Sequence, residues 1–213
     1  MTPRAVIWDW NGTLLDDLKL CVQTINQLLA RRNLPLVDTF FYREVFSFPV
    51  KDYYRRIGFD FEQEEFEVPA LEFTDLYNAD INHCRLHSSA KKTIRHFHDL
   101  QIRQFVLSAM QHDLLEKTLT SKGIRHFFEK VAGLDDHFAV SKLEQGRRLL
   151  KEIDEDPREI FLIGDTIHDY EVATELGVGC ILIADGHQSK ERLQKTGVQV
   201  LDALEELYRQ ITV

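Results

Sequence analysis

Five polar side chains with catalytic potential lie beside apolar runs or predicted helices. Asp9 follows one apolar run, Ser108 ends a second, Asp165 and Asp169 follow another, and Lys142 precedes a predicted helix. Carboxylate oxygens bind hard divalent cations such as Mg²⁺, and an ionised carboxylate can attack phosphorus. Hydroxyl and ammonium groups can bind the oxygens of a phosphoryl group. These residue types therefore favour phosphoryl-transfer chemistry if the fold brings them together.

The apolar runs predict buried strands that would position these side chains. Ala5–Trp8 ends at Asp9, and Asn11–Gly12 supplies a turn. Similar runs cover Ile102–Leu107, Glu159–Ile163 and Cys180–Ala184, and weaker ones cover Val131–Ala132 and Val198–Leu201. Helical patterns alternate with them, which is typical of a parallel sheet covered on both faces. We therefore expect a three-layer, doubly wound α/β fold, with the polar residues meeting at the carboxyl ends of the strands.

The segment from Asp17 to Ser88 breaks this alternation. Its apolar residues recur at helical spacing throughout, and three prolines interrupt it. We interpret it as an all-helical insertion joined to the sheet by two connections. The predicted division is residues 1–16 plus 89–213 for the α/β core and 17–88 for the helical cap.

The polar residues and their order resemble a known family. Asp9-Trp10-Asn11-Gly12-Thr13, Ser108, Lys142 and Gly164–Asp169 look like the four ordered motifs of the haloacid dehalogenase-like superfamily. The insertion lies where that family has its cap, and the phosphoglycolate-phosphatase-like branch is the most similar. The resemblance implies a Mg²⁺-dependent phosphatase that forms an aspartyl-phosphate on Asp9 and acts on a small phosphorylated metabolite.

The resemblance also assigns roles residue by residue. It implies catalytic positions at Asp9, Asn11 and Lys142. It implies Mg²⁺ ligands at Asp9, the backbone carbonyl of Asn11 and Asp165, with Asp169 orienting a bound water or Lys142. The residues implied in substrate binding are Gly12, Thr13, Ser108, Ala109 and Lys142.

Asn11 departs from the family pattern, in which an aspartate donates a proton to the leaving oxygen. An amide cannot donate that proton. General acid catalysis of this kind raises the reaction rate about 10²–10⁴-fold. Three outcomes are compatible with this change: a phosphatase for activated substrates, an enzyme that recruits another acid such as Asp16 or His112, or a weak or inactive relative that binds phosphate or a partner. In the cap, Lys51, Arg55 and Arg56 are either contacts for a second anionic group of the substrate or solvated charges.

The composition limits the remaining functions. The net charge of −9 disfavours nucleic-acid binding. The sequence has no apolar stretch close to the ~20 residues needed to cross a bilayer, and the first predicted strand begins near Met1. We therefore expect a cytoplasmic protein. Cys21, Cys84 and Cys180 are too far apart to indicate a disulfide framework or a zinc site. The sequence contains no indication of an oligomeric state.

Overall fold

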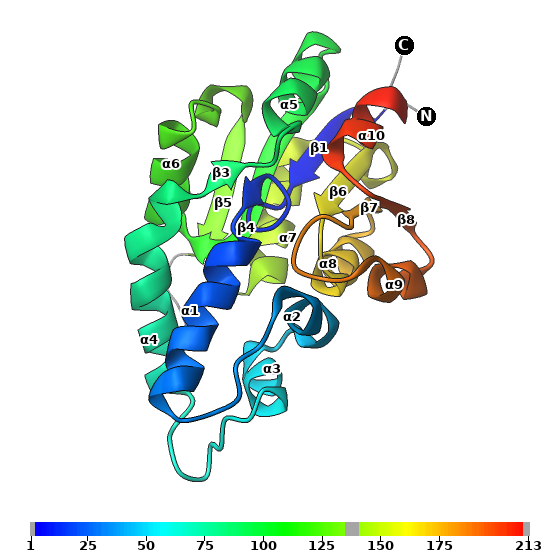
Figure 1. Ribbon diagram of the computed structural model, residues 1–213. Helices are drawn as coiled ribbons and strands as arrows, with labels where there is room; N and C mark the ends of the chain where they lie inside the picture. The colour runs from blue at the N-terminus through cyan, green and yellow to red at the C-terminus, as the bar shows by residue number, and fades with distance from the viewer. Residues whose placement is uncertain (1–2, 135–140, 211–213) are drawn as a thin grey trace.

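The computed structural model describes residues 3–134 and 141–210, and its centre is a six-stranded parallel sheet. The strand order is β5-β4-β1-β6-β7-β8 (Figure 1). The bounds are β1 Ala5–Trp8, β4 Arg103–Gln111, β5 Lys130–Leu134, β6 Ile160–Gly164, β7 Gly179–Ile183 and β8 Gln199–Leu201. Each predicted strand is present, because each apolar run can be buried fully only inside a covered sheet.

Helices cover both faces of this sheet. The helices that follow the cap are α5 Ala90–Asp99, α6 His112–Ser121, α7 Lys142–Ile153, α8 Ile167–Leu176, α9 Lys190–Leu193 and α10 Leu204–Gln210. In β1, Val6 and Trp8 pack with residues of α5, α6 and α10, whereas Ala5 and Ile7 pack with residues of α7 and α8. Successive side chains of a strand point to opposite faces, so one apolar run serves both layers. The predicted three-layer α/β class is confirmed.

Most residues of the inserted segment between β1 and α5 are in helices. These are α1 Leu18–Arg31, α2 Thr39–Val45, α3 Val50–Arg56, α4 Glu67–Asp80 and the 3₁₀ turn η1 Ile81–His83. The prediction of helix throughout is wrong at one point, because Arg85–Leu86 (β3) pairs antiparallel with Leu15–Asp16 (β2). The two connections lie side by side and satisfy each other's backbone groups. The exact domain boundaries stay a prediction.

The second predicted strand is longer than expected. β4 continues to Gln111, so Ser108 and Ala109 lie inside it rather than at its end. The register with β5 shifts between Leu107 and Gln111, and the Ser108 hydroxyl accepts a hydrogen bond from the Met110 amide at 3.1 Å. That bond satisfies an amide displaced by the irregularity. Gln111 caps α6, since its side chain accepts from the Leu114 amide.

The cap segment contacts the core through arginines of both parts. The Arg43 guanidinium, on α2, donates to the carbonyls of Ala184 and Gly186 at 2.5 and 2.8 Å. Arg192, on α9, donates to the carbonyls of Arg43 and Phe46 at 2.7 and 2.8 Å. These bonds hold α2 beside the carboxyl end of β7. Across residues 3–134 and 141–210, the helices are too short or too polar to cross a membrane, and the cytoplasmic location stays a prediction.

Candidate active site

Three carboxylates meet at the carboxyl ends of β1 and β6. Asp9, Asp165 and Asp169 are buried, and one oxygen of each lies within 4.8 Å of the others. Asp9 follows β1, Asp165 follows β6, and Asp169 is in the first turn of α8, where it completes a capping box with Thr166. The structure therefore brings together the acidic residues that the sequence placed at separate strand ends.

Lys142 links two of these carboxylates. Its ammonium group contacts the Asp9 carboxylate directly and lies 2.6 Å from Asp169 Oδ1. Lys142 is the first residue of α7, and the Ser141 side chain accepts from the Glu144 amide at the start of that helix. The start of α7 thus positions Lys142. Among the described residues, Lys142 is the only lysine or arginine that lines the cavity.

Burial and crowding set the charges of the cluster. Burial raises the pKa of Asp9, Lys142 opposes this, and Asp169 and Asp165 add to the rise. Burial also raises the pKa of Asp165, despite attraction to His187. For Asp169, Lys142 outweighs burial and lowers the pKa. One ammonium does not offset three buried carboxylates, so a further cation would stabilise their ionised forms.

The donor set fits a hard divalent ion. Carboxylate oxygens at this spacing are the ligands that Mg²⁺ prefers, and the imbalance of charge favours a cation over a neutral ligand. Backbone packing around Asp165 is tight, since a Cβ atom at Gly12 or Gly186 would lie 2.4 or 2.1 Å from its Oδ2. Gly12 also has a φ of +76°, a conformation that suits glycine. Both glycines let loops close on this carboxylate.

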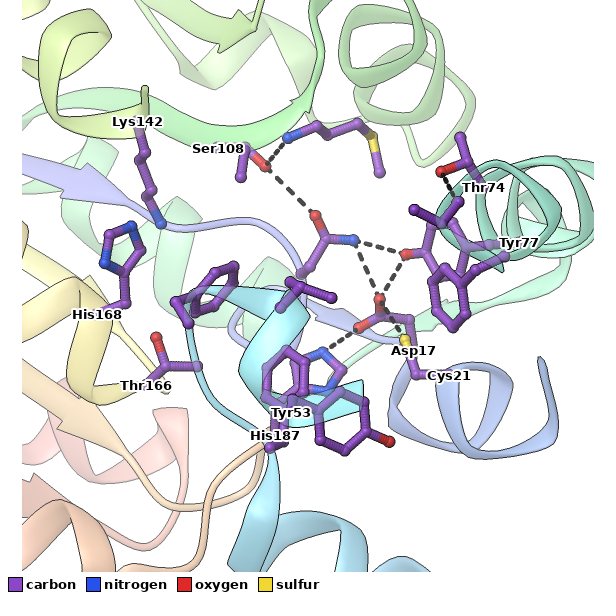
Figure 2. A pocket seen from close by; sticks show the side chains of 18 of the residues that line it. Asp17, Cys21, Tyr53, Thr74, Tyr77, Ser108, Lys142, Thr166, His168 and His187 are labelled. Carbon is purple, nitrogen blue, oxygen red and sulfur yellow. Dashed lines mark hydrogen bonds and ion pairs between the residues drawn. The ribbon is translucent and has the colours of Figure 1, made fainter. Parts of the chain in front are cut away.

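The Asn11 side chain is held by a network that the sequence did not predict. Its amide nitrogen donates to Asp17 Oδ2 at 3.0 Å and to the Tyr77 hydroxyl at 2.6 Å, and the Tyr77 hydroxyl donates to Asp17 at 2.5 Å. The Ser108 hydroxyl donates to Oδ1 of the Asn11 side chain at 3.3 Å. Figure 2 shows Asp17 and Tyr77 converging from the start of α1 and from α4. Residues of the cap therefore fix the side chain at the position where the family pattern has its acid.

A buried ion pair completes this network. His187 Nε2 lies 3.2 Å from Asp17 Oδ1 (Figure 2). The Tyr42 hydroxyl lies 3.2 Å from Nδ1 of the same ring. Burial alone would lower the pKa of His187, but Asp17 raises it to about 9. Burial alone would raise the pKa of Asp17, but His187, Tyr77 and Asn11 lower it. The pair is thus an imidazolium and a carboxylate.

The site opens into a cavity of about 410 Å³ between the core and the cap segment. Asp9, Asn11, Ser108 and Lys142 line its core side. Aromatic and aliphatic side chains from the inserted helices and their connections form the opposite wall; they are Tyr42, Phe46, Phe48, Val50, Tyr53, Tyr54, Phe66, Ala70, Leu71, Phe73 and Tyr77. A volume of this size accommodates a small organic molecule.

The residues predicted to bind substrate occupy different places. Ser108 and Ala109 line the cavity beside Lys142, whereas Gly12 and Thr13 do not. The Gly12 amide donates to Asp17 Oδ1 at 2.8 Å and to the Leu15 carbonyl at 2.9 Å. The Thr13 hydroxyl donates to Asp165 Oδ1 at 2.8 Å. The structure thus gives Gly12 and Thr13 partners within the protein, and their contact with substrate stays a prediction.

The alternative acids and the cap cations do not reach the cavity. Asp16 is exposed on β2, and neither it nor His112 lines the cavity. Lys51 Nζ lies 5.6 Å from the ring centroids of Phe61 and Phe66, outside the lining. Arg55 pairs with Asp52 at 2.7 Å, and Arg56 is exposed. These cations lie outside the lining of the cavity, and whether they meet a substrate stays a prediction.

Sequence reasoning missed Asp17, Tyr77 and His187. Asp17 was taken only as the start of the insertion, and Tyr77 gave no signal apart from helical spacing. His187 follows the run Cys180–Ala184 by three residues. The rule that polar residues gather at strand ends, applied to this run, could have found it.

The fold and the buried carboxylate cluster define an α/β protein with an acidic site at the strand ends and a helical insertion over it. The model of the haloacid dehalogenase-like hydrolases matches residues 6–183, and the chain belongs to this family. The resemblance inferred from the motifs is thereby confirmed.

Several known proteins are similar over most of the chain. N-acetylmuramic acid 6-phosphate phosphatase of Pseudomonas putida is 27% identical, with 88% of this chain and 85% of that protein covered. The structure of protein tyrosine kinase A from Mycobacterium tuberculosis has a TM-score of 0.83 at 21% identity, covering 100% and 99% of the chains. A predicted phosphoglycolate phosphatase from Haemophilus somnus has a TM-score of 0.78 at 17% identity, covering 100% and 99%.

Proposed function

We propose that the chain is a Mg²⁺-dependent phosphatase that hydrolyses a small organic phosphate through an aspartyl-phosphate on Asp9. The observation that carries this proposal is the contact of Asp9 with Lys142, beside Asp165 and Asp169, at the core side of the cavity. Membership of a hydrolase family and similarity to a sugar-phosphate phosphatase support it.

The residues present divide the reaction into two displacements. An Asp9 oxygen attacks phosphorus, and the bond from phosphorus to the leaving oxygen breaks with its electron pair on that oxygen. A water oxygen then attacks the same phosphorus, the bond to Asp9 breaks, and phosphate and a proton are released. The leaving oxygen takes its proton from water, because the Asn11 amide has none to give.

The other polar residues would hold the transferring group. Lys142 and the Ser108 hydroxyl are suited to bind phosphoryl oxygens, and Asp169 fixes the Lys142 ammonium at 2.6 Å. Asp9, the Asn11 carbonyl and Asp165 would hold Mg²⁺, with Asp169 beside them. When bound, the ion would reduce the repulsion between the carboxylate and the phosphate.

The proposal is tested by measuring phosphate release from a panel of phosphate esters and from acetyl phosphate. Each substrate is assayed with Mg²⁺ and with EDTA. We expect turnover that requires Mg²⁺ and falls at least about 10³-fold in the Asp9→Asn variant, because the attacking group is removed. Asp75→Asn, which changes an exposed carboxylate on α4, should behave like the wild type. Phosphate binding without any turnover would instead favour the second candidate, a phosphate-binding relative that lost its acid at Asn11.

A further inference from the structure

The wall of the cavity that faces Asp9 is aromatic. Phe46 lies at the centre of a ring cluster, with centroid distances of 5.3 Å to Tyr53 and 5.5 Å to Phe48, both T-shaped. Phe48 also lies 4.7 Å from the ring of His168. T-shaped and tilted packing is the arrangement by which aromatic rings bind another ring. The wall is therefore suited to a planar, uncharged group.

Two residues of this wall are partly uncovered. Phe48 is 39% exposed and Leu71 is 49% exposed, although both line the cavity. Exposed large apolar side chains beside a cavity gain from being covered by a ligand. The apolar part of a substrate would bury them while its phosphate reaches Lys142.

Near the cap, the His187 imidazolium lines the cavity but is already paired with Asp17, so it offers no free charge to a second anionic group. Four guanidinium or ammonium groups of the cap and of α9 are engaged elsewhere: Arg43 and Arg192 donate to backbone carbonyls, Arg32 pairs with Glu64 at 2.7 Å, and Lys51 lies over two rings. A carboxylate placed against this wall would lose hydration without gaining a partner. Substrates with a carboxylate close to the phosphate are therefore disfavoured.

The chemistry of Asn11 sets a second, independent condition on the leaving group. Without a proton donor, the leaving oxygen departs as an anion. A phenol such as the tyrosine side chain has a pKa of about 10, whereas that of water, which alkyl alcohols resemble, is about 15.7. A phenolate therefore leaves without protonation far more readily than an alkoxide does.

Both conditions are met by one class of molecule, and we infer that the substrate is an aryl phosphate, a monoester of a phenol. This inference rests on the proposed phosphatase function. The ring packs against Phe46, Phe48 and Leu71, and the ester oxygen points toward Asn11. When Asp9 attacks phosphorus, the phosphorus–oxygen bond breaks and the phenolate leaves, taking a proton from water afterwards.

The test compares four substrates in the presence of Mg²⁺. Phenyl phosphate has the ring and the good leaving group, cyclohexyl phosphate has similar size but an alkoxide, phosphoglycolate adds a carboxylate, and acetyl phosphate is activated but has no ring. We expect kcat/KM for phenyl phosphate to exceed that for cyclohexyl phosphate and phosphoglycolate by about 100-fold or more, the scale of acid catalysis that Asn11 lacks. We also expect a lower KM for phenyl phosphate than for acetyl phosphate.

The outcomes separate this inference from the proposed function. Turnover of acetyl phosphate without a preference for phenyl over cyclohexyl phosphate would overturn the aryl inference and leave a phosphatase. If no substrate is turned over, the proposed function fails. The aryl inference, which names a substrate, then fails with it, whereas a preference for phenyl phosphate over the other esters supports both.

Two phenylalanine variants test the wall itself. Phe48→Ala should raise KM for phenyl phosphate about tenfold, the equivalent of one aromatic contact. Phe40→Ala removes a ring that is 76% exposed and outside the cavity lining, and it should change nothing. Equal effects of the two variants, or the same tenfold loss on acetyl phosphate in Phe48→Ala, would contradict the ring contact.

Discussion

At the scale of single residues, the chemistry depends on what surrounds Asn11. Its amide is not a free side chain beside the nucleophile, because Asp17 and Tyr77 both accept its hydrogen-bond donors. The carboxylate of Asp17 is in turn paired with His187. The position that lacks an acid therefore lines the cavity with its amide already bound in a satisfied, charged network.

The first prediction concerns this position. Asn11→Asp should raise kcat/KM for cyclohexyl phosphate by about tenfold or more, because a carboxyl group beside the buried Asp17 carboxylate retains its proton and can donate it. It should also lower the free energy of unfolding by about 1–3 kcal/mol, since a protonated carboxyl group offers one donor to the buried network where the amide offers two. Phosphate release and urea denaturation measure the two effects.

A matched control for this variant is Asn78→Asp, which adds a carboxyl group to the same cavity at another place. It should not raise the activity. If Asn11→Asp binds Mg²⁺ and yet shows no gain, either another acid is already in place or the site does not catalyse hydrolysis.

At the scale of elements, one histidine joins three segments. His87 follows β3, and its Nε2 donates to the Gly12 carbonyl at 3.1 Å while Nδ1 lies 3.2 Å from the Asp185 carboxylate. Its backbone amide donates to the Leu14 carbonyl at 3.0 Å. Both ring nitrogens face acceptors, and only the protonated imidazolium can donate a hydrogen bond from each of them. The loop after β1, the return from the cap and the loop after β7 are thereby held together.

This arrangement predicts a pH dependence of stability. Burial alone would lower the pKa of His87, but Asp185 raises it above 6.5, and His87 lowers the pKa of Asp185. A histidine whose pKa is raised by folding contributes its full stabilisation at pH values below its unfolded pKa of about 6.5. This contribution is lost as the pH rises through its pKa in the folded protein. His87→Gln should therefore cost more stability at about pH 5.5 than at about pH 9.

The size of this difference should be below about 1 kcal/mol, because the Asp185 side chain is 58% exposed and water screens the pair. Urea denaturation of the wild type and the variant at both pH values measures it. His83→Gln, which removes a histidine paired with Asp80 on the surface, should show a smaller difference. An equal cost of His87→Gln at both pH values would contradict a charged His87.

At the scale of the whole molecule, the proposed metal site depends on the folded chain. Asp9 and Asp165 are contributed by neighbouring parallel strands that are far apart in the sequence, with Trp8 paired to Ile163. An unfolded chain does not hold these oxygens together. An ion bound at this cluster would therefore stabilise the native state selectively.

The third prediction follows from this linkage. Mg²⁺ at about 100 times its dissociation constant should raise the free energy of unfolding of the wild type by about 2.7 kcal/mol relative to EDTA. Asp165→Asn should remove most of this gain, whereas Asp75→Asn should keep it. Thermal or urea unfolding measures the difference. A wild type whose stability is the same with Mg²⁺ and with EDTA would argue against the site.

The sequence by itself determined the fold class and the acidic residues of the cluster. The strands at Ala5–Trp8 and Ile160–Gly164 were predictable because an unbroken apolar run is a local signal, and residues that follow such runs must share one edge of a parallel sheet. This is why Asp9 and Asp165 could be placed together. The family resemblance then supplied their expected roles, which stay predictions.

Only the tertiary structure decided what surrounds those residues. Asp17, not its neighbour Asp16, faces the site, and it meets His187 from 170 positions along the chain and Tyr77 from the cap. No sequence pattern encodes such meetings, because they depend on how helices pack over the sheet rather than on local spacing. The same packing left Lys51, Arg55 and Arg56 of the cap outside the cavity and placed aromatic side chains such as Phe46 and Tyr53 in its wall.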